Sequence, residues 1–126
     1  MRRLLRLFLA IALLAPGTSA PADAGAEARA AYARGEQALR QGKPRVARIE
    51  LLNAITADPA NGAAHMLQGQ VYLRLRDGTA AAAEFARARG TGIAAGATRH
   101  LMAEALLLHG DAQPALDEAS AADEVL

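Results

Sequence analysis

GEQALRQGKPRVARIELLNAITADPAN, residues 35–61, is the stretch that decides the fold. Two runs with the apolar period of an α-helix flank the turn residues 41–43, and the second run stops at Pro59. Proline cannot continue a helix, and Asn61 is a favourable N-cap for the helix that follows. The stretch therefore predicts a helix-turn-helix pair.

The small and large residues of this pair recur after 34 residues. Sliding the sequence on itself by 34 aligns Gly35 with Gly69, Ala47 with Ala81, Leu51 with Phe85 and Ala54 with Ala88. A second step reaches Ala103, Ala115, Ala119 and Ala122, and turn signals recur at 41–43, 76–78 and 109–111. We therefore expect no strand and six helices, over residues 26–41, 44–57, 61–75, 79–89, 96–109 and 112–124.

These positions resemble the tetratricopeptide repeat, a helix-turn-helix unit of about 34 residues. The family pattern has small residues at the eighth, twentieth and twenty-seventh positions and a large residue at the twenty-fourth. The resemblance implies an all-α solenoid over residues 26–126. Three repeats fit, over residues 28–61, 62–95 and 96–126, the last of them incomplete.

The residue types at these positions have a packing reason. Small residues let the two helices of a pair cross closely, and the large twenty-fourth residue fills the space between one pair and the next. Leu51 and Phe85 hold that position in the first two repeats, whereas the third has Ala119. We therefore expect the third repeat to be the loosest.

Within this family, the wording of residues 35–61 and 69–88 is similar to repeats of bacterial envelope proteins associated with the exosortase (PEP-CTERM) and exopolysaccharide system. That similarity implies a place in exopolysaccharide or protein-sorting machinery. It rests on the texture of the sequence, because no diagnostic motif accompanies it.

The N-terminus has the three regions of a signal peptide, predicted over residues 1–22. Basic residues 1–6 precede the apolar run 7–14, and small residues follow. We expect cleavage after Ala22, with Ala20 and Ala24 as alternatives. The apolar run is far shorter than the roughly 20 residues of a membrane-spanning helix, although an uncleaved anchor is the alternative. The sequence thus predicts a periplasmic or secreted protein of the bacterial cell envelope.

Charge and composition restrict the function. Without the three arginines of the leader, 11 basic residues face 13 acidic ones, so nothing favours nucleic-acid binding. No Lys or Arg follows Arg99, which leaves an acidic C-terminal end. The chain has no cysteine, which excludes disulfides, thiolate nucleophiles and thiolate metal sites.

Catalytic and metal-binding residues are scarce. His100 and Glu104 are one helical turn apart and His109 ends the same helix, but a zinc site needs at least three ligands, and no further one is placed to complete it. Ser120, the only serine after the leader, has no histidine near it in sequence, and His65 falls at a normally buried repeat position. We expect neither an enzyme nor a cofactor, and we interpret these histidines as solvated or packed side chains.

The family resemblance also implies a binding face. In tetratricopeptide proteins the second, fifth, ninth and thirteenth positions of each first helix line a concave groove for a protein or peptide. Tyr32 and Glu36 stand where carboxylate-clamp members carry Lys and Asn, which argues against that binding mode. The positions carried over are Arg29, Tyr32, Glu36, Arg40, Met66, Gln70, Arg74, His100, Glu104 and Leu108.

The leading hypothesis is therefore an exported scaffold that holds a protein or peptide partner. One alternative is that these repeats begin a longer protein with an enzymatic domain. Another is a structural assembly subunit, a homo-oligomer formed through an open C-terminal repeat, because the chain stops at Leu126 without a polar cap.

Overall fold

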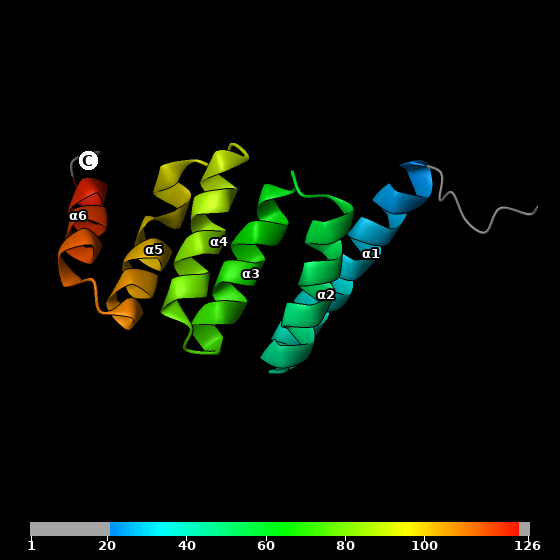
Figure 1. Ribbon diagram of the computed structural model, residues 1–126, viewed down its shortest axis with the longest axis horizontal. Helices are drawn as coiled ribbons and strands as arrows, with labels where there is room; N and C mark the ends of the chain where they lie inside the picture. The colour runs from blue at the N-terminus through cyan, green and yellow to red at the C-terminus, as the bar shows by residue number, and fades with distance from the viewer. Residues whose placement is uncertain (1–20, 124–126) are drawn as a thin grey trace, which may run out of the picture.

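A computed structural model of the protein describes residues 21–123, which form helices and turns without a strand. Figure 1 shows the helices side by side in chain order along the long axis. Their bounds are α1 Pro21–Arg40, α2 Pro44–Ala57, α3 Gly62–Arg74, α4 Gly78–Gly90, α5 Ala95–His109 and α6 Ala112–Asp123.

The bounds of α2 to α6 agree with the sequence prediction to within one residue, but the predicted start of α1 at residue 26 is wrong. The helix begins five residues earlier, at Pro21. Proline suits the first helical turn, Asp23 lies favourably in that turn, and the intervening alanines are strong helix formers. A cut after Ala22 or Ala24 would therefore fall inside α1, whereas residues 1–20 of the predicted leader lie outside the described part.

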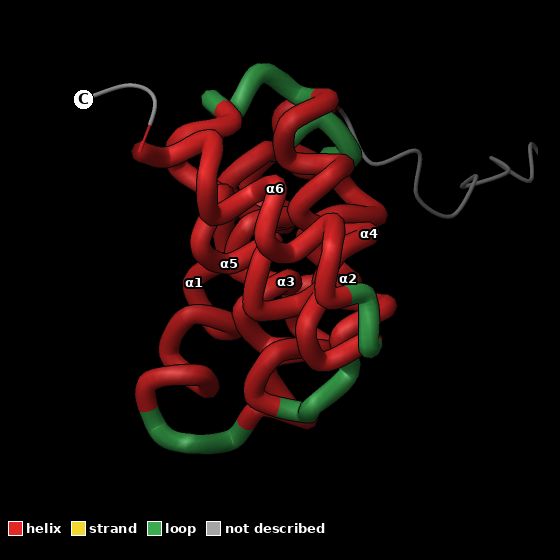
Figure 2. The backbone as a smooth tube through the Cα atoms, turned by 90° about the vertical axis from the view of Figure 1, so that its left-hand side faces the viewer, coloured by secondary structure: helices red, strands yellow, loops and turns green. Residues whose placement is uncertain are grey.

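Each helix packs mainly on the helices that precede and follow it in the chain. Viewed from the side, α1 and α5 lie on one flank of the molecule and α2 and α4 on the other (Figure 2). This arrangement is a solenoid, in which neighbouring units supply the burial that no single pair achieves. None of the described helices is long and apolar enough to cross a membrane.

The turns explain where the helices stop. Asn61 caps α3 by accepting a hydrogen bond from the Ala64 amide at 3.1 Å. Gly42 and Gly110 adopt left-handed backbone, with φ of 69° and 101°, one residue or two after their helices end. The same place in the middle repeat, 34 residues from each, is held by Arg76 with φ of 62°. It is the one non-glycine residue in this conformation among residues 21–123.

The small and large positions of the repeat meet as expected. Leu51 and Phe85 are completely buried, and each lies against the glycine at the eighth position of its own repeat. A β-carbon on Gly35 would lie 2.6 Å from Cγ of Leu51, which is closer than real atoms approach. Only glycine permits these crossings.

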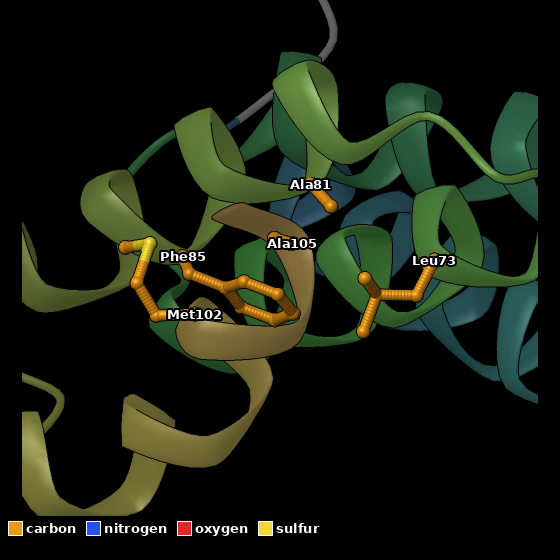
Figure 3. Packing of buried hydrophobic residues seen from close by; sticks show 5 residues of the cluster. All are labelled: Leu73, Ala81, Phe85, Met102 and Ala105. Atoms are coloured by element: carbon orange, nitrogen blue, oxygen red, sulfur yellow. The ribbon is translucent and has the colours of Figure 1, made fainter. Parts of the chain in front are cut away.

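The Phe85 ring also joins two repeats. Figure 3 shows it between residues of α3 and α5, with Leu73 on one side and Met102 and Ala105 on the other. Leu51 occupies the same place one repeat earlier, packed with Val71 of the next pair. These two side chains are the expected links between successive helix pairs.

The third repeat lacks such a link. Ala119 is exposed, and of the α6 side chains that the structure describes only Ala115 is buried. The apolar packing between α5 and α6 is therefore thinner than in the preceding pairs.

Candidate binding face

The residues nominated on α3 share one side of the helix. Met66, Gln70 and Arg74 are spaced by four residues, which aligns them along the helix. Arg74 is exposed and the other two are half-buried, while the opposite side of α3 carries the buried residues. This strip is the part of α3 that its neighbours leave uncovered.

The nominated residues of α1 form a matching strip. Arg29 and Arg40 are exposed, and Tyr32 and Glu36 are half-buried between them. Arg40 forms an ion pair with Glu36, with 3.3 Å between Nη1 and Oε1. Burial raises the pKa of the Tyr32 phenol, and the nearby Glu36 carboxylate raises it further, so the phenol stays neutral and can donate a hydrogen bond.

On α5, His100 and Glu104 are exposed and Leu108 is half-buried. The sequence reasoning missed Leu107, which is 60% exposed on the same side. Its spacing of seven residues from His100 and three from Glu104 is the signal that could have found it. We call the uncovered strips of α1, α3 and α5, comprising the ten nominated residues and Leu107, the odd-helix face.

Charge is distributed unevenly over the odd-helix face. Arg29 and Arg74 form no ion pair with any described residue, whereas Arg40 is neutralised by Glu36. Glu104, on α5, is also outside any ion pair with the described residues. The face therefore offers guanidinium donors on α1 and α3 and a carboxylate acceptor on α5, with Met66 and Leu107 as apolar contacts.

Four surface hollows of the described chain lie elsewhere. One of them is bounded by α2, α3 and α4 and is lined by Leu52, Ile55, Pro59 and Arg87, with His65 and Glu84 at its base. None of the four is lined by any of the ten nominated residues. The odd-helix face is thus an accessible surface without an enclosed pocket.

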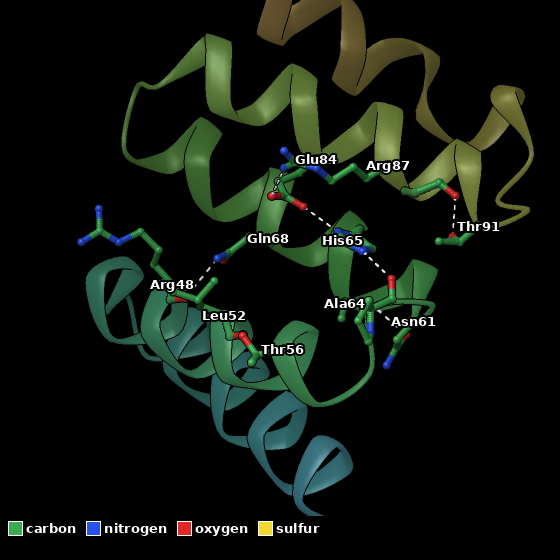
Figure 4. A network of polar contacts seen from close by, with 12 residues as sticks. Arg48, Leu52, Thr56, Asn61, Ala64, His65, Gln68, Glu84, Arg87 and Thr91 are labelled. Carbon is green, nitrogen blue, oxygen red and sulfur yellow. Dashed lines mark hydrogen bonds and ion pairs between the residues drawn. The ribbon is translucent and has the colours of Figure 1, made fainter. Parts of the chain in front are cut away.

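His65 is part of a buried polar network, shown in Figure 4. It is 5% exposed; its Nε2 lies 2.9 Å from the Pro59 carbonyl oxygen and its Nδ1 lies 2.7 Å from Glu84 Oε2. Because a carbonyl oxygen only accepts, Nε2 must carry a proton, and a second proton must lie between Nδ1 and the carboxylate. Arg87 Nη1 donates to the other oxygen of Glu84 at 2.6 Å. The pair fastens α3 to α4.

Glu84 belongs to a register that the sequence reasoning overlooked. Glu50, Glu84 and Glu118 are spaced by 34 residues, and each accepts a hydrogen bond from a cation or histidine. Arg34 Nε donates to Glu50 at 2.8 Å, and Arg89 donates to both oxygens of Glu118 at 2.8 Å. The period itself was the available signal.

The Arg89 contact holds the loose third repeat. Arg89 on α4 also donates from Nε to the buried Thr98 hydroxyl at 2.6 Å, so it bridges α4, α5 and α6. The hydrogen bonds with Arg89 lower the pKa of the Glu118 carboxyl, which Arg99 lowers further, against a smaller opposing effect of burial. Arg99 itself donates to the Ala121 carbonyl at 3.0 Å. Polar contacts thus supplement the thin core beside Ala119.

The described residues contain no group of three side chains suited to hold a metal ion. His100 is exposed, and His109 is engaged at the far end of α5. Its Nδ1 lies 2.6 Å from the Thr79 hydroxyl, and its Nε2 lies 3.7 Å from Asp111. Ser120 donates to the Leu116 carbonyl of its own helix at 2.8 Å. These contacts match packed or solvated side chains.

Stacked helix pairs with an accessible face and a buried core of glycine, alanine and single large residues define the class of α-solenoid scaffolds. Residues 32–98 match the family model described as Tetratricopeptide repeat, and the chain belongs to this family. Repeats of this family are protein-interaction scaffolds and are generally not catalytic. No curated protein and no solved structure matches the chain.

Proposed function

We propose that the protein is an exported scaffold of the bacterial cell envelope that holds a protein or peptide partner on its odd-helix face. The observation that carries this proposal is the uncovered strip on each odd-numbered helix, in register at the repeat period. Tyr32, Met66 and His100 occupy one repeat position, and Arg40, Arg74 and Leu108 occupy another. A partner crossing all three helices would meet rows of side chains instead of isolated ones.

The composition of these rows supports a peptide-like partner. Arginine, tyrosine and methionine are enriched at protein interfaces, and lysine is depleted there. The unpaired guanidinium groups of Arg29 and Arg74 can donate to carboxylates or backbone carbonyls of a partner. Export is proposed from the leader pattern of residues 1–22, and a role in exopolysaccharide or protein-sorting machinery from the wording of the repeats.

The test is partner capture from detergent-solubilised envelope extracts with a charge-reversed face. Arg40→Glu with Arg74→Glu reverses two exposed cations of the odd-helix face. The matched control, Arg45→Glu with Arg48→Glu, makes the same charge change on the exposed side of α2. We expect the first variant to lose the captured proteins and the control to retain them. Equal capture by both variants would show that the face is wrongly assigned.

A further inference from the structure

We propose that the exposed side of α2 docks onto an anionic lipid surface. We call this surface the α2 ridge and define it by Lys43, Arg45, Val46, Arg48, Ile49 and Leu52. The inference is independent of the odd-helix face, because it concerns a different helix and a different ligand.

The first observation is exposed aliphatic surface. Val46, Ile49 and Leu52 are 48%, 56% and 55% exposed, and they follow one another at three-residue steps along α2. The core contacts of α2 are made by Ala47, Leu51 and Ala54. The three aliphatic side chains are therefore surplus to the fold.

The second observation is charge. Lys43, Arg45 and Arg48 flank the aliphatic side chains, and none of them pairs with an acidic side chain among residues 23–121. The only acidic residue of α2, Glu50, is neutralised by Arg34 at 2.8 Å. The ridge thus presents cations and aliphatic groups without a competing carboxylate, the combination that interfacial helices use on anionic membranes.

The third observation is shape. The ridge stands between two hollows, one against α1 that includes Ala33 and Val46, and one against α4 that includes Leu52 and Arg87. A protein partner needs a complementary surface for such a ridge. A lipid interface adapts to it, with aliphatic side chains entering the headgroup region and arginines reaching phosphates along their flexible stems.

The fourth observation is the distribution of charge along the molecule. The last basic residue is Arg99, and the acidic side chains of Asp111 and Asp117 are exposed at the α6 end. Figure 1 places α2 and α6 well apart along the long axis. An anionic surface would therefore attract the α2 end and repel the α6 end, which orients the ridge toward it.

The experiment is cosedimentation of the full chain with vesicles containing about one-third phosphatidylglycerol in phosphatidylcholine, compared with pure phosphatidylcholine. Arg45→Gln with Arg48→Gln removes two cations of the ridge. We expect binding to the anionic vesicles to fall about 25-fold, about fivefold for each arginine. The matched control, Arg29→Gln with Arg74→Gln, changes charge equally on the odd-helix face and should bind as the parent does. Residues 1–20 are common to all variants, so differences between variants report on the ridge.

A second variant tests the aliphatic part. Ile49→Ser with Leu52→Ser keeps the charge and should lower binding to anionic vesicles by about tenfold or more. Circular dichroism checks that both ridge variants keep the parent's helicity. Equal binding to neutral vesicles, or equal loss in the control, would overturn the proposal. So would concentration-dependent dimers that lose the ridge contact in Arg45→Gln with Arg48→Gln while no variant binds lipid, because the ridge would then serve a second copy of the chain.

Discussion

Gly69 packs directly beneath the ring of Phe85, so a β-carbon on Gly69 would overlap the ring. Phe85 is completely buried and contacts residues of the next helix pair, so the ring cannot move aside without disturbing both pairs. This single contact joins the inner crossing of a repeat to the packing between repeats.

Gly69→Ala is therefore expected to lower the free energy of unfolding by about 1 to 3 kcal/mol through overpacking, despite the better helix propensity of alanine. Chemical denaturation followed by circular dichroism measures the change. Gly96→Ala is the control, because Gly96 also lies in a helix but has open space where the β-carbon would stand. It should be neutral or slightly stabilising, and a Gly69→Ala variant that behaves like Gly96→Ala would contradict the packing described.

Arg76→Gly should stabilise the protein. Arg76 holds a left-handed backbone conformation, with φ of 62°, at the repeat position where Gly42 and Gly110 stand. Removing the side chain relieves the steric cost of that conformation, so we expect a gain of about 0.5 to 1 kcal/mol in the free energy of unfolding. Thermal denaturation of the parent and the variant measures it. A lower melting temperature for Arg76→Gly would count against the strained turn.

Breaking the buried His65 and Glu84 pair should be costly. His65→Leu leaves Glu84 buried with only Arg87 as a partner, and we expect a loss of about 2 to 3 kcal/mol in the free energy of unfolding. Glu84→Gln should cost less, because a glutamine amide can donate to Nδ1 of a neutral His65 while Nε2 still donates to Pro59. Denaturant titration of both variants ranks them, and the reverse order would show that the proton placement is wrong.

The Arg89 and Glu118 contact should make the stability depend on pH. Because Arg89 lowers the pKa of Glu118 in the folded state, the carboxylate stabilises the fold above its ordinary pKa of 4.5, and this is lost as the pH falls through the lowered value. At pH 6 we expect Glu118→Gln to be less stable than the parent by about 1 kcal/mol, since solvent screens this partly open pair. At pH 2 to 3 the two should converge, and a constant difference across pH would contradict the pairing.

Much of the fold could be predicted because steric demands at helix crossings repeat with the period of the unit. Gly35 and Leu51 predict Gly69 and Phe85, and Asn61 marks a helix start by its capping chemistry. The start of α1 could not be placed correctly because Pro21 suits a first helical turn as well as a segment before it.

The electrostatic contacts were beyond the sequence for a different reason. A glutamate at a helix surface looks the same in sequence whether it is solvated or paired, and only the fold brings Arg89 beside Glu118 or His65 beside Glu84. The odd-helix face could be nominated from the repeat period, yet its partner has no counterpart in the chain. The face therefore stays a prediction.

The most direct test of the central proposal, that a partner lies across the odd-helix face, is site-specific photo-crosslinking in the native envelope. A photoreactive residue is placed at Gln70, in the middle of the face, and separately at Ala86, an exposed position on the outer side of α4. The account predicts a discrete crosslinked protein or peptide from position 70 and none from position 86. Crosslinking of the same partner from position 86 alone, or from neither position while the protein still captures that partner, would contradict it.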